Sequence, residues 1–292
     1  MAPMEVSMRA SAATLAVLGL LAASFAGGAS GAGSPNVAAL QVGLRTHGLY
    51  QGTVDGVLGP RTERAVMRFQ RRAGLSPDGA IGPRTRKAFG RYGRRGPLGR
   101  RDLAIGTRGW DVAALQFALA WHGFPSAVFD GVLGAHTDTA LRKFQRWAGL
   151  DPDGTAGPST YAALRRPVPR SPIKLLAPVA GAYGDLYGPR GNRFHAGIDI
   201  PASKGTPVGA AAAGRVVFAA VGEGFGKLVV LEHAHGVRTR YAHLSRITVR
   251  VGQYVKASAT VGLVGATGEA TGPHLHFEVL VRGANVDPLS AL

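Results

Sequence analysis

The sequence predicts a multidomain α+β protein in which two small three-helix modules precede a mostly antiparallel all-β domain. Two observations lead to this expectation. Residues 36–89 align without a gap with residues 111–164, and about half of the aligned positions are identical, which indicates a repeated structural unit. The last third of the 292-residue chain instead carries short Val-rich runs separated by Gly-containing turns, as an antiparallel β domain does.

Each repeat has the pattern of three short helices. In the first repeat Val37, Leu40 and Leu44 recur at helical spacing, and Gly48 ends this first helix. Pro60 opens the second helix, and a later Gly-Pro pair opens the third. Asp-Gly pairs between them predict turns. The second repeat has the same pattern, so we expect the same three-helix fold twice.

These patterns divide the chain into six predicted segments. They are a secretory signal with a small-residue spacer (residues 1–34), a first repeat (35–90), a basic linker (91–108), a second repeat (109–165), a second linker (166–174) and a β domain (175–292). Both linkers are rich in Arg, Pro and Gly, so we expect them to be extended or flexible rather than packed. They are either solvated connections or electrostatic attachments to an anionic polymer.

The net charge of the chain and its N-terminal sequence restrict the classes of partner that it can have. The net charge of +17 favours polyanions, namely nucleic acid, anionic lipid or an anionic cell-wall polymer. Arg9 precedes an apolar run over residues 12–26, and small residues follow, which is the pattern of a secretory signal. Cleavage of this signal or its retention as an anchor are both open, and no stable membrane span is expected after its removal. A secreted chain argues against nucleic acid and favours the cell wall.

The chain has no cysteine, so a metal would be held by His, Asp, Glu, Asn or backbone oxygen. His195 and Asp199 lie four residues apart around a glycine, and such a pair can converge on one ion. His274 and His276 alternate with apolar residues in a predicted strand, so both imidazoles project from one face. His243 lies in another predicted strand.

Catalytic zinc takes three protein ligands and keeps one position for water or substrate. Four histidines and one aspartate therefore divide into three ligands and two acid/base groups, and the spacing alone leaves the assignment open. His233 and His235 have the same i, i+2 spacing, but they precede a glycine at a predicted hairpin end, and we interpret them as part of a turn.

Two resemblances narrow these alternatives. The repeats, with their LQ, DGxxG, FQ and DGxxGPxT elements, resemble the peptidoglycan-binding-like domain of wall hydrolases, which implies peptidoglycan as a partner and leaves anionic wall polymers as a second one. The segments YGPRGNRFH, FHAGIDI, RYAHL and GATGEATGPHLHFEV, between Pro178 and Pro288, are similar to LytM/lysostaphin-type zinc metallopeptidases.

This second resemblance implies a single zinc ion bound by His195, Asp199 and His276, with His243 and His274 as catalytic residues. The glycine-rich turn before His274 departs from the family by having Ala270 where a serine is usual, and we expect this to remove only a turn hydroxyl. Glu278 lies two residues after His276 on the same strand face, where it either orients that ligand or is an exposed carboxylate.

The expected function is that of a secreted zinc endopeptidase that hydrolyses peptide cross-links or bridges of peptidoglycan and is anchored by the repeats. Two alternatives are a non-catalytic regulator of other wall hydrolases and a purely adhesive wall protein with a zinc-stabilised β domain. Because the chain keeps all three implied ligands and both implied catalytic histidines, the sequence favours the enzyme.

Overall fold

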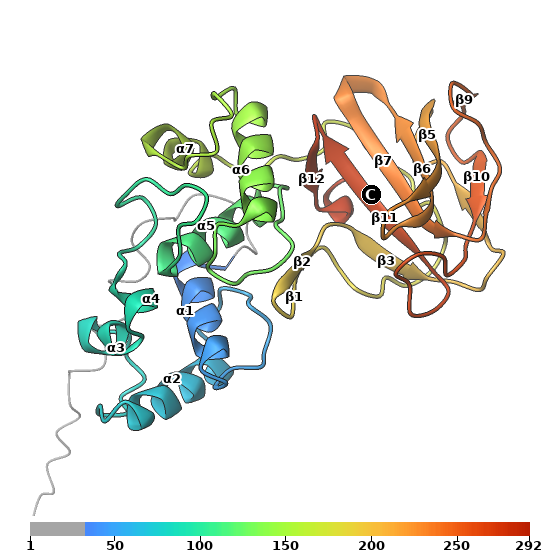
Figure 1. Cartoon of the computed structure of the whole chain (residues 1–292). Helices are drawn as coiled ribbons and strands as arrows, with labels where there is room; N and C mark the ends of the chain where they lie inside the picture. The colour runs from blue at the N-terminus through green and yellow to red at the C-terminus, as the bar shows by residue number, and fades with distance from the viewer. Residues whose placement is uncertain (1–32) are drawn as a thin grey trace, which may run out of the picture.

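The computed structural model describes residues 33–292, so the charged and apolar segments of the predicted secretory signal lie outside the described residues. A helical part precedes a β domain (Figure 1), which confirms the predicted fold class. None of the described helices is long and apolar enough to cross a membrane. The helices are α1 (Pro35–Thr46), α2 (Pro60–Arg72), α3 (Pro83–Ala88), α4 (Arg91–Arg94), α5 (Trp110–Trp121), α6 (Ala135–Trp147) and α7 (Pro158–Leu164).

A buried glutamine holds each Asp-Gly turn of the repeats. The side-chain amide of Gln41 donates to Asp55 Oδ1 over 2.7 Å, and its carbonyl oxygen accepts from the backbone N–H of Gly56 over 2.9 Å. The same arrangement recurs at Gln70, Gln116 and Gln145. Because each glutamine satisfies turn groups that would otherwise be buried without partners, the repeated Leu-Gln and Phe-Gln pairs have a structural explanation.

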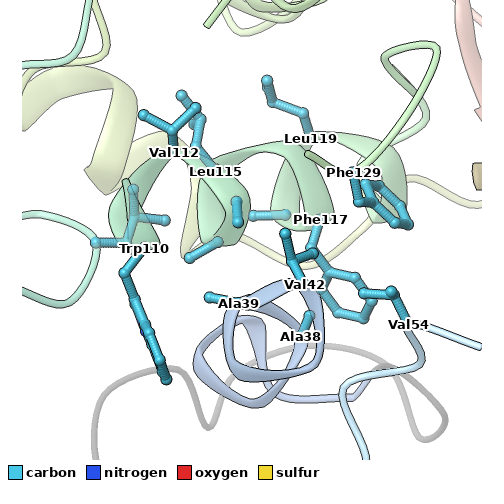
Figure 2. Close-up of a cluster of buried hydrophobic side chains, with 14 of the residues drawn as sticks. Ala38, Ala39, Val42, Val54, Trp110, Val112, Leu115, Phe117, Leu119 and Phe129 are labelled. Carbon is cyan, nitrogen blue, oxygen red and sulfur yellow. The ribbon is translucent and has the colours of Figure 1, made fainter. Parts of the chain in front are cut away.

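The two repeats share one hydrophobic core. Helix α1 of the first repeat packs against α5 of the second, and Figure 2 shows Val42 of α1 facing Phe117 of α5. Trp110, at the start of α5, is 3% exposed and stacks at an angle on Tyr92. The repeats therefore form one helical body.

The expectation that residues 91–108 are extended or flexible is wrong. This segment contains α4, and its Leu98 and Leu103 are buried in the shared core. Leu103 also exchanges two backbone hydrogen bonds with Ala156, of 3.1 and 2.8 Å. Although the segment is rich in arginine, its two leucines and its tyrosine pack into or against the shared core and hold the segment in place. In the second linker, residues 167–174 contain neither helix nor strand.

The β domain is built around one large antiparallel sheet. Its order is β12-β11-β7-β6-β5-β9, and β3 also pairs with β11. A small sheet of order β4-β10-β8 and the β1-β2 hairpin complete the domain. The strands are β1 (Gly188–Arg190), β2 (Arg193–His195), β3 (Ile198–Pro201), β4 (Pro207–Gly209), β5 (Gly214–Gly222), β6 (Gly226–Glu232), β7 (Val237–Leu244), β8 (Arg246–Ile247), β9 (Tyr254–Val255), β10 (Thr260–Leu263), β11 (His274–Val281) and β12 (Ala284–Val286).

Alternation along β11 separates the two faces of this sheet. Leu275 and Phe277 are fully buried in the main core of the β domain, as predicted. His274 and His276 lie on the opposite face, because successive strand side chains point to opposite sides. The face opposite the core therefore carries the polar groups of the candidate site.

The second repeat docks on the β domain next to β2. Trp121 packs edge-on against Phe194 of β2, with ring centroids 5.3 Å apart. At the tip of the β1-β2 hairpin, the carbonyl of Asn192 accepts from Phe129 N–H over 2.7 Å. Gly123 meets β12, where its carbonyl accepts from the N–H of Asn285 over 3.1 Å. The helical body and the β domain are thus joined by backbone hydrogen bonds as well as by ring packing.

This docking predicts unequal effects of one substitution at two equivalent glycines. Gly123 and Gly48 occupy the same position in the two repeats, with φ of +89° and +69°. The Cβ added by Gly48→Ala would contact no other atom, so this substitution should lower the free energy of unfolding by about 1 kcal/mol through backbone strain alone. Gly123→Ala would also overlap the backbone of Asn285, so it should cost about 1–3 kcal/mol more.

Differential scanning calorimetry measures both effects. We expect Gly123→Ala to separate the unfolding of the helical body from that of the β domain, whereas Gly48→Ala keeps the cooperativity of the parent protein. Equal effects of the two substitutions would contradict a docked second repeat.

Candidate metal centre

His195, Asp199 and His276 converge from three strands of the β domain. The donor atoms of the three side chains all lie within 4.8 Å of one another. Asp199 Oδ1 is 3.1 Å from His195 Nε2 and 2.8 Å from His276 Nδ1. The antiparallel register of β3 and β11 places Asp199 directly opposite His276, and β2 delivers His195 beside them.

Hydrogen bonds on the far side of each ring orient the two imidazoles. His195 Nδ1 is 2.9 Å from the carbonyl oxygen of Leu186, and His276 Nε2 is 3.2 Å from Glu278 Oε1. These acceptors assign the ring proton to the outer nitrogen in both cases. Once they lose the proton that each shares with Asp199, the inner nitrogens, His195 Nε2 and His276 Nδ1, direct their lone pairs to one point, as metal-binding histidines do.

Electrostatics at this point favours positive charge. Burial alone would raise the pKa of Asp199, but hydrogen bonds from His195 and His276 hold it well below its usual range. Burial alone would lower the pKa of His276, but the carboxylates of Asp199 and Glu278 raise it to about 9. Two carboxylates that stay ionised around a buried imidazole create a negative potential at the cluster, which suits a cation.

His243 and His274 lie beside the three-residue cluster. The two rings are 4.8 Å apart, and His274 Nε2 is 3.7 Å from Asp199 Oδ1. Each ring is bonded through Nδ1 to a backbone carbonyl, His243 to Thr267 over 2.7 Å and His274 to Gly272 over 2.9 Å. Neither Nε2 has a hydrogen-bond partner within residues 33–292. Burial lowers the pKa of His243, which favours its neutral, proton-accepting form.

The backbone at His243 is specialised for this placement. Its φ of +59° is unusual for a residue other than glycine, and the β6-β7 pairing shifts register between Tyr241 and Leu244, the stretch that contains it. A hydrogen bond of 2.8 Å from its N–H to the carbonyl of Phe225 holds the conformation. The irregularity turns the imidazole toward His274 where a regular strand would not. Strain of this kind is often found at functional sites.

The five side chains line an open cleft of about 790 Å³. Its rim is mostly acidic, with Asp185, Glu223 and Glu269 against one cation, Arg190. The Arg190 guanidinium lies 2.8 Å from Asp185 and 3.5 Å from Asp199 Oδ2. Because no residue of the helical body lines this cleft among the described residues, it is open to a substrate.

Three residues that support the site, Arg190, Arg240 and Asn285, were not assigned a role from the sequence, and Glu278 was left with two alternatives. Glu278 is 3% exposed and buried behind His276, so it is not the exposed carboxylate that was one of the alternatives. Arg240 pairs with Glu278 over 2.9 Å, and the Asn285 amide donates to the same carboxylate over 3.0 Å. Arg190 lies in the YGPRGNRFH segment, which carried the only sequence signal for any of the three.

The other histidines have structural surroundings. His233 is buried, with Nδ1 2.9 Å from the carbonyl of Ala213 and Nε2 2.7 Å from Thr239 Oγ1. His235 lies in a short 3₁₀ turn (Ala234–Gly236) that has no buried residue, which agrees with the predicted turn. His47 and His122 occupy equivalent helix ends, each packed edge-on against phenylalanine.

An antiparallel β domain with a His/Asp/His cluster and two further histidines in an open cleft is of the metallohydrolase class. Comparison with known families is more specific. Residues 193–288 match the model of peptidase family M23, and residues 33–89 and 108–164 match that of the peptidoglycan binding domain. The chain therefore carries an M23 peptidase domain after two peptidoglycan-binding-type domains, which confirms both resemblances.

Similar proteins share the peptidase domain. The DD-carboxypeptidase/endopeptidase Mpg of Neisseria meningitidis is 46% identical over 98 residues, or 34% of this chain and 23% of that protein. The peptidoglycan DD-endopeptidase ShyB of Vibrio cholerae is 44% identical over 97 residues, or 33% of this chain and 23% of that protein. This chain thus spans less than a quarter of the length of either relative. The catalytic domain of lysostaphin from Staphylococcus simulans is 37% identical and superposes with a TM-score of 0.35, covering 37% of this chain and 90% of that domain.

The buried His233 predicts a pH dependence of stability that is separate from the metal centre. Burial lowers its pKa below 6.5, so the unfolded chain binds a proton that the folded protein resists. Stability should therefore be complete above about pH 6.5 and fall as the pH drops toward the lowered pKa. Urea unfolding at pH 7.5 and 5.5 measures this, and His233→Gln should flatten the dependence. An unchanged slope in that variant would contradict it.

Proposed function

We propose that this chain is a zinc-dependent endopeptidase that hydrolyses peptide cross-links or bridges of bacterial peptidoglycan. The observation that carries the proposal is the constellation in one open cleft of His195, Asp199 and His276 beside His243 and His274. The two peptidoglycan-binding-type domains on the same chain support the choice of substrate. The relatives named for peptidoglycan endopeptidase activity support the choice of reaction.

The donor set fits zinc. Two imidazole nitrogens and one carboxylate oxygen are borderline donors of the kind that zinc accepts, and three protein ligands leave one position open. The donor atoms lie 2.8–3.1 Å apart, close to the spacing of about 3.3 Å that tetrahedral zinc with ligands at about 2.0–2.1 Å requires. Such an ion, when bound, lowers the pKa of a coordinated water to about 7 and polarises the scissile carbonyl.

We assign the proton transfers to His243 and His274. Both rings present a free Nε2 to the cleft, because both Nδ1 atoms are bonded to backbone carbonyls. One neutral imidazole can accept a proton from the attacking water, and the other can donate a hydrogen bond to the developing oxyanion once it is protonated. The same pair can then return a proton to the leaving amine.

The cellular location of the protein follows from the proposed substrate. Peptidoglycan lies outside the cytoplasmic membrane, so we infer that the protein is secreted and works at the cell wall. The two repeats would hold it on that polymer, and anionic wall polymers are a second candidate for the basic surface of the chain.

A chelation experiment tests the reaction. Purified peptidoglycan treated with the mature protein should release new amino termini, which can be quantified with an amine-reactive dye. A zinc chelator should stop the release, and added zinc should restore it. Release that continues unchanged in chelator, with zinc content measured as zero, would exclude a zinc-dependent reaction.

Substitution separates metal binding from proton transfer. His243→Ala should keep one zinc per chain, measured by plasma mass spectrometry, while cleavage falls by about 10²–10⁴-fold. Asp199→Ala should lose both zinc and cleavage. His235→Ala is the matched control, because this histidine lies in an exposed turn, and it should keep both. Loss of zinc in His243→Ala would instead make this residue a ligand.

A further inference from the structure

The sheet face that carries the metal centre continues into a second groove of about 810 Å³. The β11 side chains that follow His276 on this face are Glu278 and Leu280, and Leu280 lines the groove. Phe225 lines both depressions, so the groove adjoins the cleft. Helix α6 of the second repeat stands beside this end of the sheet (Figure 1) and forms the far wall of the groove through Lys143, Arg146 and Trp147.

The floor of this groove is apolar. Leu228, Val230 and Ala242 form a small cluster that is separate from the main core, with Val217 and Phe225 packed against it. Phe218 adds a ring that is 37% exposed at its edge. If this face of the sheet were exposed to water alone, polar side chains would be expected at these positions. Leu228 and Val230 are only 6% and 9% exposed, so the apolar floor lies recessed between the charged walls of the groove.

The walls of this groove are basic. Among the residues that the structure describes, its lining includes five cations and no carboxylate; the cations are Lys143, Arg146, Arg238, Arg240 and Arg282. Arg238 is paired with Glu232 and Arg240 with Glu278. Within residues 33–292, no ion pair involves the other three, and all three are exposed. The Arg282 guanidinium lies over the Trp147 ring at 5.5 Å, which joins the sheet side to the helix side.

Docking of the second repeat keeps α6 in place. Asn285 N–H donates to the Gly123 carbonyl, and Phe129 N–H donates to the Asn192 carbonyl at the hairpin tip, so the helical body is held against the β domain. The groove is therefore a fixed feature that neither domain forms alone.

We propose that this basic groove binds the carboxylate-bearing part of the wall peptide while the metal cleft holds the bond to be cut. This inference rests on the proposed function. The unpaired cations match peptide carboxylates, and the apolar floor fits short aliphatic side chains. The rim of the cleft has the opposite charge, through Glu223 and Glu269, and suits the ammonium groups of the same branched peptide. This asymmetry fixes the direction in which the peptide lies.

The repeats supply a matched control for this proposal. Arg146 of α6 and Arg71 of α2 occupy the same position in the two repeats, and both are exposed. Only Arg146 lines the basic groove. Arg146→Glu and Arg71→Glu therefore change the net charge equally, at equivalent helical sites, and differ only in the groove.

The probe is a fluorescent, cross-linked stem-peptide dimer with free carboxylates, together with the same dimer after amidation of those carboxylates. Binding is measured by fluorescence anisotropy with the zinc-loaded chain, in a His243→Ala background that slows cleavage by about 10²–10⁴-fold. Arg146→Glu should weaken binding of the free-acid dimer by about fivefold to tenfold, and Arg71→Glu should leave it unchanged. The amidated dimer should bind both variants alike. Lys143→Glu is a second groove variant, and circular dichroism checks the fold of each.

Cleavage assays with His243 restored distinguish this proposal from the proposed function. If the parent enzyme cleaves the dimer but Arg146→Glu and Arg71→Glu bind it equally, the basic groove has no part in recognition and the proposal is overturned. If groove variants lose affinity for the free-acid dimer alone and the parent enzyme cleaves nothing, the groove stands and the endopeptidase function fails. Loss of affinity for poly(glycerol phosphate) without any change for the dimer would assign the groove to a phosphodiester polymer and overturn the proposal.

Discussion

The pairing of β3 with β11 is the interaction on which the candidate site depends. It sets Asp199 directly opposite His276, so two members of the cluster are a cross-strand pair instead of neighbours on a loop. On the other face of the same two strands, Ile198 and Ile200 pack with Phe277 and Leu275 in the core. Burial of these apolar residues fixes the register. A slip of one residue would move His276 into the core and expose the apolar side, which is costly.

Strand periodicity made part of this arrangement predictable. The alternation in His274-Leu-His276-Phe requires one polar and one apolar face, and the structure has Leu275 and Phe277 fully buried with both histidines opposite. The four-residue spacing of His195 and Asp199 also allowed convergence. The groups that orient the rings were not predictable, because the acceptors for His195, His243 and His274 are backbone carbonyls of loops. Glu278 remained ambiguous because its partner Arg240 lies 38 residues away and meets it only through the β7-β11 register.

The helical part was likewise predictable in some features and not in others. Gly, Pro and the Leu-Gln and Phe-Gln pairs predicted three helices per repeat, and buried glutamines explain why these pairs recur. The shared core and the docking were not predictable, since Val54 and Phe129 bond to the β1-β2 hairpin through backbone N–H groups that any residue would provide. The packed state of residues 91–108 was missed because average composition hides Leu98 and Leu103 among arginines.

Docking changes the role that the repeats can have. A module on a flexible linker acts by effective concentration, which depends on linker length and leaves the orientation of the enzyme free. Here the second repeat contacts the hairpin that carries His195 and also meets Asn285, whose amide bonds to Glu278 behind His276. A module fixed in this way limits the orientations of the cleft relative to a bound polymer. For the proposed endopeptidase, this would lower the entropic cost of aligning the scissile bond with His243 and His274, in addition to keeping the enzyme on its substrate.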